Sequence, residues 1–150
     1  MTENDNTHEQ EGGWLAKTAY ALFDVGNSAV GAMHATFIFA VYFASVVAPE
    51  NGTSYWGYTT GAAALVVAIL GPILGGLADS KAQRKMFLAV VVMIGVIANI
   101  ILWKVEPNQA FIWFALIFSF FSILANELMF VFYNALLPSV ASKKNMGRVS

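Results

Sequence analysis

Cysteine is absent from this sequence of 150 residues, and charged residues make up only 11% of it. The lack of cysteine excludes a disulfide framework and a thiolate metal site. The lack of charge sets the chain apart from ordinary soluble domains, in which about 25% of residues are charged. The net charge of -1 gives no indication of nucleic-acid binding.

Motifs for enzyme chemistry are also absent. The sequence has no phosphate-binding glycine loop, no paired-histidine zinc motif and no defensible Ser-His-Asp set. We therefore predict no catalytic residue, no metal and no cofactor, and we do not expect an enzyme.

What the sequence does contain is four long stretches without Asp, Glu, Lys or Arg. They are 25, 28, 18 and 20 residues long and run from Val25 to Pro49, Asn51 to Ala78, Met86 to Trp103 and Pro107 to Asn126. A helix needs about 20 apolar residues to cross a bilayer, and continuous apolarity lacks the alternation of a membrane strand. The pattern predicts an all-α integral membrane protein with a transmembrane domain at 14–150 and helices at about 20–48, 55–78, 86–103 and 110–138.

Basic residues predict the orientation of these helices, because cytoplasmic loops carry an excess of Lys and Arg. With four spans, seven of the eight basic residues fall on one side, and only Lys104 falls on the other. The seven are Lys17, Lys81, Arg84, Lys85, Lys143, Lys144 and Arg148. Residues 1–13 contain four acidic side chains and no basic one, unlike a signal peptide. We predict that they form a disordered acidic tail in the cytoplasm.

The second span carries a stripe of small residues at spacings of four and three, which keep one face of a helix. The stripe consists of Gly57, Gly61, Ala64, Ala68, Gly71 and Gly75. Small residues let another helix approach closely, so we predict packing against further helices of the same protein or of another copy. A direct contact with a substrate is the alternative. The third span is mostly aliphatic, with Asn99 as its one strong polar group, and is predicted to be peripheral.

The first span combines an apolar helix with one polar face. Tyr20, Asp24, Asn27, Gly31 and His34 recur at steps of four and three. Lipid cannot satisfy such a face, so it is expected to look into protein or into an aqueous cavity.

The fourth span carries the second polar set, and its Glu127 is the only charged residue well inside any predicted span. A charged group at mid-membrane costs about 2.5–3.5 kcal/mol or more, which makes a function the default hypothesis. A helix-to-helix hydrogen bond is the structural alternative, for Glu127 as for His34. The polar set is Ser119, Ser122, Asn126, Glu127, Tyr133 and Asn134.

The polar residues of the first and fourth spans are predicted to border one pathway for a solute or for protons. Glu127 and His34 are the candidates for proton exchange, since His changes its charge near neutral pH. Hydrogen-bonding groups would hold the solute. The pathway residues are Asp24, Asn27, His34, Asn126, Glu127, Tyr133 and Asn134.

Three motifs in the sequence resemble a known family. The segment YALFDVGNSA from Tyr20 to Ala29 is similar to the first-helix signature of the vacuole effluxer-like family, in which Asp24, Asn27, Ser28 and Ala29 match. FYNALLP at 132–138, followed by GRVS at 147–150, is similar to a second signature of that family. Gly75 and Asp79, with the basic Arg84 and Lys85, resemble the loop motif between helices two and three of the major facilitator superfamily.

The resemblance implies the first part of a twelve-helix transporter that works by alternating access, with helices one and four lining the cavity. It further implies export of a small solute such as an amino acid, across a bacterial plasma membrane or, in a fungus, a vacuolar one. Proton coupling is one option for the driving force. The alternative is a small four-helix membrane protein that acts as a homo-oligomeric scaffold or exporter.

Overall fold

The computed structural model describes residues 14–80 and 83–140. The predicted tail at 1–13, Lys81 of the basic loop and the GRVS motif at 147–150 lie outside the described residues. The helical elements are α1 (Trp14–Gly31), η1 (Ala32–Phe37), α2 (Phe39–Tyr42), η2 (Phe43–Val47), α3 (Gly52–Ser80), α4 (Arg84–Leu102), η3 (Gln109–Phe111) and α5 (Ile112–Val140).

These elements form four membrane spans, as the charge-free stretches predict. Four segments are long and apolar enough to cross a bilayer, namely Thr18–Val47, Gly52–Ala78, Arg84–Leu102 and Gln109–Leu136. The described residues contain no strand. The prediction of an all-α integral membrane protein with four transmembrane helices is therefore confirmed.

The first span is interrupted, which the sequence did not predict. Its middle and its far end are wound as π-helix, in η1 and η2. The backbone N–H of Ile38 donates to the carbonyl of Met33 at 2.9 Å, and that of Ala48 donates to Phe43 at 2.8 Å. Both bonds join residues five apart, the spacing of π-helix, which occurs mostly as short bulges within α-helices and frequently at functional sites.

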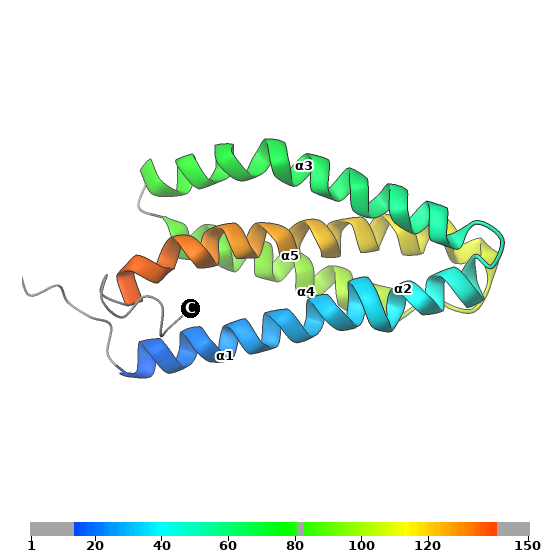
Figure 1. Ribbon diagram of the computed structural model, residues 1–150, viewed down its shortest axis with the longest axis horizontal. Helices are drawn as coiled ribbons and strands as arrows, with labels where there is room; N and C mark the ends of the chain where they lie inside the picture. The colour runs from blue at the N-terminus through cyan, green and yellow to red at the C-terminus, as the bar shows by residue number, and fades with distance from the viewer. Residues whose placement is uncertain (1–13, 81–82, 141–150) are drawn as a thin grey trace, which may run out of the picture.

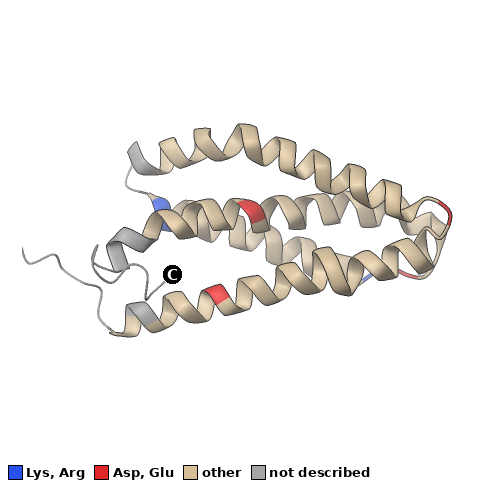
Figure 2. Cartoon of the chain, in the orientation of Figure 1, with Lys and Arg blue, Asp and Glu red and all other residues tan. Residues whose placement is uncertain are grey.

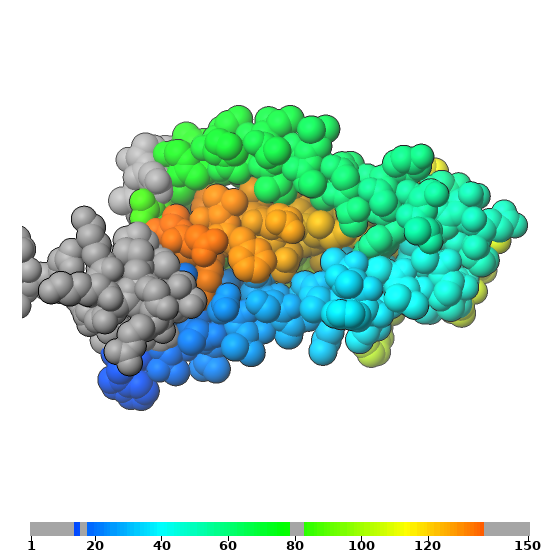
Figure 3. Space-filling view, in the orientation of Figure 1, coloured from blue at the N-terminus to red at the C-terminus, as the bar shows by residue number. Residues whose placement is uncertain are grey.

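The bundle is organised around α5. This helix packs against α4 and α3 along much of its length and against α1 more sparsely. Figure 1 shows α5 between α3 and the α1–α2 span, with α4 behind. In the space-filling view, the surface of α5 is visible between α1 and α3 (Figure 3). Among the described helices, the fourth span thus makes the most extensive contacts with the other spans.

Two apolar clusters hold the bundle together at different levels. One joins Phe43 and Val47 of η2 to Ala115 and Leu116 of α5. The other joins α3, α4 and α5 through Ala78, Val91, Leu128 and Phe132. Neither cluster contains a residue of α1. The amino-terminal half of the first span is therefore held mainly by its own contacts with α5.

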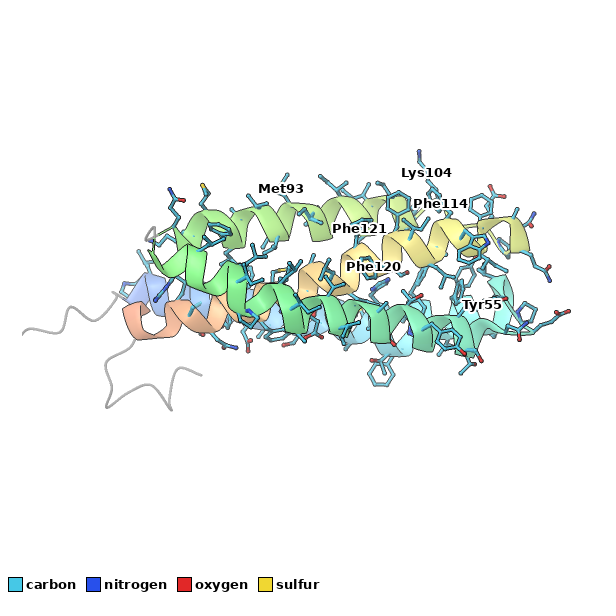
Figure 4. The ribbon with its side chains drawn as sticks, turned by 90° about the horizontal axis from the view of Figure 1, so that it is seen from above. Tyr55, Met93, Lys104, Phe114, Phe120 and Phe121 are labelled. Atoms are coloured by element: carbon cyan, nitrogen blue, oxygen red, sulfur yellow. The ribbon has the colours of Figure 1, made fainter. Side chains whose placement is uncertain are left out.

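The outer surface of the bundle is apolar, as a surface in contact with lipid should be. On α4, Val90, Met93, Ile97 and Ile100 are all exposed, and Figure 4 shows Met93 on the outer side of that helix. Most of the described charged residues lie near the two ends of the bundle (Figure 2). The end where α1 begins is called the amino-terminal end below, and the other the opposite end.

Candidate functional site

The polar faces predicted for the first and fourth spans meet in the structure. The two helices run antiparallel, and side chains of α5 contact the first span at three successive levels. At the middle level, the Asn126 Nδ2 donates to the Asn27 Oδ1 at 3.0 Å. Because lipid offers no partner for an amide, this bond gives each asparagine a partner within the protein.

A glycine makes this asparagine contact possible. A Cβ atom added at Gly31 would lie 3.2 Å from the Asn126 Oδ1 and 3.5 Å from its Nδ2. The missing side chain therefore leaves the space that the amide of Asn126 occupies between the helices.

At the amino-terminal end, the contact is aromatic. The rings of Tyr20 and Tyr133 stack with their centroids 3.9 Å apart, and Phe23 stacks on Tyr133 at 5.2 Å. The hydroxyl of Tyr133 donates to the backbone carbonyl of Tyr20 at 2.9 Å. Both tyrosines are buried, so they close the gap between α1 and α5 at this level.

Deeper in the bundle, His34 is buried, with only 8% of its surface exposed. Its Nε2 lies 3.4 Å from the Ser119 Oγ and its Nδ1 lies 3.3 Å from the Ser122 Oγ. Asn99 of α4 extends this set, since its Nδ2 donates to the Ser122 Oγ at 2.9 Å and to the Gly95 carbonyl at 2.8 Å. Three helices thus share one hydrogen-bonded network.

The π-helical turn η1 places His34 in this network and is itself tied to α3. The indole Nε1 of Trp56 donates to the carbonyl of Ala35 at 3.3 Å. The ring of Trp56 also packs against the rings of His34, Phe39 and Phe43. This contact fixes the irregular part of the first span against the second.

A cavity of about 1220 Å³ borders these contacts. Its lining comes from the first span, from α4 and from α5, and it includes Asn27, His34, Asn126 and Glu127. Asp24, Tyr133 and Asn134 do not line it. The volume would hold a small organic solute.

The two acidic pathway residues, Asp24 and Glu127, lie on the same side of the α1–α5 contact. Asp24 is turned about 60° around α1 from Asn27, and Glu127 is turned about 100° around α5 from Asn126. Because α1 and α5 run antiparallel, both rotations turn the side chains toward the same side of the α1–α5 contact, which is the side where α3 lies. Glu127 is exposed, and neither carboxyl has a hydrogen-bond or ion-pair partner among the side chains that the structure describes.

The small-residue stripe of α3 divides into two parts. A Cβ added at Gly71 or Gly75 would lie 3.7 or 3.8 Å from Val131 of α5, which is ordinary contact. One added at Gly57 or Gly61 would meet nothing within 4 Å. The first part packs within the bundle, whereas the second faces outward.

The remaining predicted residues lie at the amino-terminal end. The guanidinium of Arg84 donates to the carbonyl of Ala135 at 2.6 Å and so ties the start of α4 to α5. Lys85 and Asn134 are exposed. The side chain of Asp79 is outside the described part of the chain.

Three residues of the site were not assigned a role from sequence. Ser119 and Ser122 belong to the polar set of the fourth span, and their steps of three and four to the next polar residue of the set were a usable signal. Asn99 stood alone on an aliphatic helix, and only its contact with Ser122 connects it to the site.

Comparisons with known proteins give one family. Residues 39–149 match the model of the family described as vacuole effluxer Atg22 like. An uncharacterized MFS-type transporter of Bacillus subtilis (strain 168), YxiO, is 32% identical over 148 residues, which cover 95% of this chain. The chain spans 32% of the length of that relative. No solved structure matches significantly.

Proposed function

Because the chain belongs to the vacuole effluxer Atg22 like family of the major facilitator superfamily, we propose that it is part of a secondary transporter. The transporter moves a small solute across a membrane by alternating access. The observation that carries the proposal is the row of polar contacts between the first and fourth spans, beside a cavity in an otherwise apolar bundle.

Hydrogen-bonding groups of this row bind the solute. Asn27 and Asn126 line the cavity and are paired with each other, so a polar solute can replace each amide as the partner of the other. Tyr133 and Asn134 bind the solute nearer the amino-terminal end. There, the stacked rings of Tyr20 and Tyr133 form the closed side of the pathway.

Protons drive the transport through Glu127 and His34, with Asp24 at the mouth of the pathway. Glu127 lies about 22 Å along α5 from Ile112, near the middle of the helix. A carboxyl at that depth without a partner in the described chain is suited to exchange a proton as the cavity opens to either side.

The amino-terminal end faces the cytoplasm in this proposal, since Arg84 and Lys85 lie there. Gly57 and Gly61 receive a further helix of the same transporter, and Gly75, Asp79, Arg84 and Lys85 form the cytoplasmic loop motif. The solute is an amino acid or a similar metabolite and is exported. The membrane is the plasma membrane of a bacterial cell, which the Bacillus relative supports.

The test is transport by the complete protein in liposomes loaded with single amino acids. We expect counterflow of at least one of them. Asn126→Leu should slow it about tenfold, because the loss of one hydrogen bond in the pathway corresponds to roughly 1.4 kcal/mol. Phe121→Leu, at an exposed position of the same helix, is the control. Counterflow that is unaffected by Asn126→Leu would exclude the pathway, and the absence of counterflow for every solute tried would count against transport of this class.

A further inference from the structure

Asn99 is the one strong polar group between Met86 and Trp103, and the proposed pathway does not use it. It nevertheless reaches His34 through one intermediate, the hydroxyl of Ser122. Four groups from α4, α5 and η1 are therefore connected in series: the Gly95 carbonyl, the Asn99 amide, the Ser122 hydroxyl and the His34 ring.

The direction of hydrogen bonding along this series is fixed at its first member. A backbone carbonyl can only accept, so the atom of Asn99 that lies 2.8 Å from the Gly95 oxygen must be the amide nitrogen. The same nitrogen lies 2.9 Å from the Ser122 Oγ and donates its second hydrogen there. Ser122 is therefore an acceptor toward Asn99.

Ser122 has a single hydrogen left to donate. In the part of the chain that the structure describes, its only other hydrogen-bond contact is the His34 Nδ1 at 3.3 Å. Acceptance from Asn99 strengthens the Ser122 hydroxyl as a donor, whereas no described side chain does the same for Ser119. Ser122 therefore donates to Nδ1, and because a nitrogen that accepts a hydrogen bond carries no proton, a neutral His34 ring carries its proton on Nε2. That N–H lies 3.4 Å from the Ser119 Oγ, which accepts it.

We infer that Asn99 is a positioning residue that fixes His34 in the Nε2–H tautomer and leaves Nδ1 as its proton-accepting nitrogen. Among the described residues, the ring forms hydrogen-bond or aromatic contacts with Ser119, Ser122, Trp56 and Phe39, and none of these four is charged. Hydrogen bonding alone therefore selects the tautomer. The significance for transport rests on the proposed proton coupling, in which a proton reaches Nδ1 only when the Ser122 hydroxyl turns away.

The tautomer can be read directly by nitrogen NMR of the complete protein in lipid bilayers, with ¹⁵N in its histidines. The spectrum of His34→Gln identifies the His34 signals by difference. At mildly alkaline pH, where an imidazole is neutral, we expect one species with a proton on Nε2 and none on Nδ1. A native protein with its proton on Nδ1 would overturn the inference.

Asn99→Asp is the sharper test, because it should invert the tautomer. An aspartate oxygen at this place accepts from Ser122, and in the protonated acid the hydrogen goes to the Gly95 carbonyl. Ser122 then has only a lone pair for His34, so Nδ1 must carry the proton. Asn99→Ala should give a mixture of both tautomers.

Asn108→Asp is the control, since Asn108 accepts from the Ala110 N–H and an aspartate can do the same. It should leave the His34 spectrum unchanged. Retention of Nε2–H in both Asn99→Asp and Asn99→Ala would show that Asn99 does not select the tautomer. The spectra can be recorded whether or not the protein transports a solute. The inference about the tautomer and the proposed function are therefore tested independently.

Discussion

Glu127→Gln is expected to abolish uptake driven by a pH gradient and to leave exchange of solute at equal pH intact. Glutamine keeps the size and polarity of the side chain but cannot take up or release a proton. Glu127 is exposed near the middle of α5, without a partner among the described residues, so its replacement breaks no contact of the described bundle. Uptake into proteoliposomes with and without an imposed pH gradient measures the effect.

Glu106→Gln is the matched control, because Glu106 is exposed in the loop before α5, outside the membrane spans. It should retain full dependence on the gradient. His34→Gln should behave like Glu127→Gln, since both side chains line the same cavity. If both variants keep the native gradient dependence, protons do not pass through this pair, and Glu127 has a structural hydrogen-bonding role instead.

Gly95→Leu should destabilise the bundle where α4 meets α5. Gly95 is buried where α4 meets α5, and a Cβ there would lie 3.3 Å from the Ala125 Cβ and 3.4 Å from the Met129 Cε. A leucine would force the two helices apart, at a cost of about 1–3 kcal/mol for an overpacked core. A fall in the thermal unfolding midpoint of the purified protein in detergent measures this.

Gly76→Leu is the control for that substitution, since a Cβ at Gly76 would meet nothing within 4 Å. It should leave the midpoint unchanged, and equal midpoints for Gly95→Leu and Gly76→Leu would contradict the close contact of α4 with α5.

Gly61→Leu examines the proposed contact with a further helix. It should lower the midpoint of the complete protein, although it touches nothing in the four described helices.

The membrane fold could be predicted from sequence because a bilayer imposes a simple rule. A span must be long and free of charge, and four stretches of this chain meet that condition. The row of polar contacts between the first and fourth spans could be predicted as well, because a polar face on a lipid-exposed helix needs protein or water beside it. The spacing of Asn27 and His34 predicted the polar face of the first span. The structure adds the hydrogen-bond partners of these two residues, which are Asn126, Ser119 and Ser122 of α5.

Other features depend on tertiary contacts that spacing does not contain. The π-helical turns leave no mark in the residue pattern, and Trp56 binds the carbonyl of Ala35 across 21 positions of the chain. Glycines that look alike in sequence differ in the structure, since Gly95 meets α5 closely whereas Gly57 faces outward. Which small residue is at an interface is decided by the neighbouring helix, not by the residue itself.

Alternating access makes a prediction about a single side chain. Ser28 is exposed and lines the cavity, and this chain has no cysteine to interfere. In cells and inverted vesicles, an impermeant thiol reagent should label Gln83→Cys only from the cytoplasm and Asn51→Cys only from outside. It should label Ser28→Cys from both sides, in proportions that change when solute is added. Labelling of Ser28→Cys from one side alone, with and without solute, would contradict transport through this cavity.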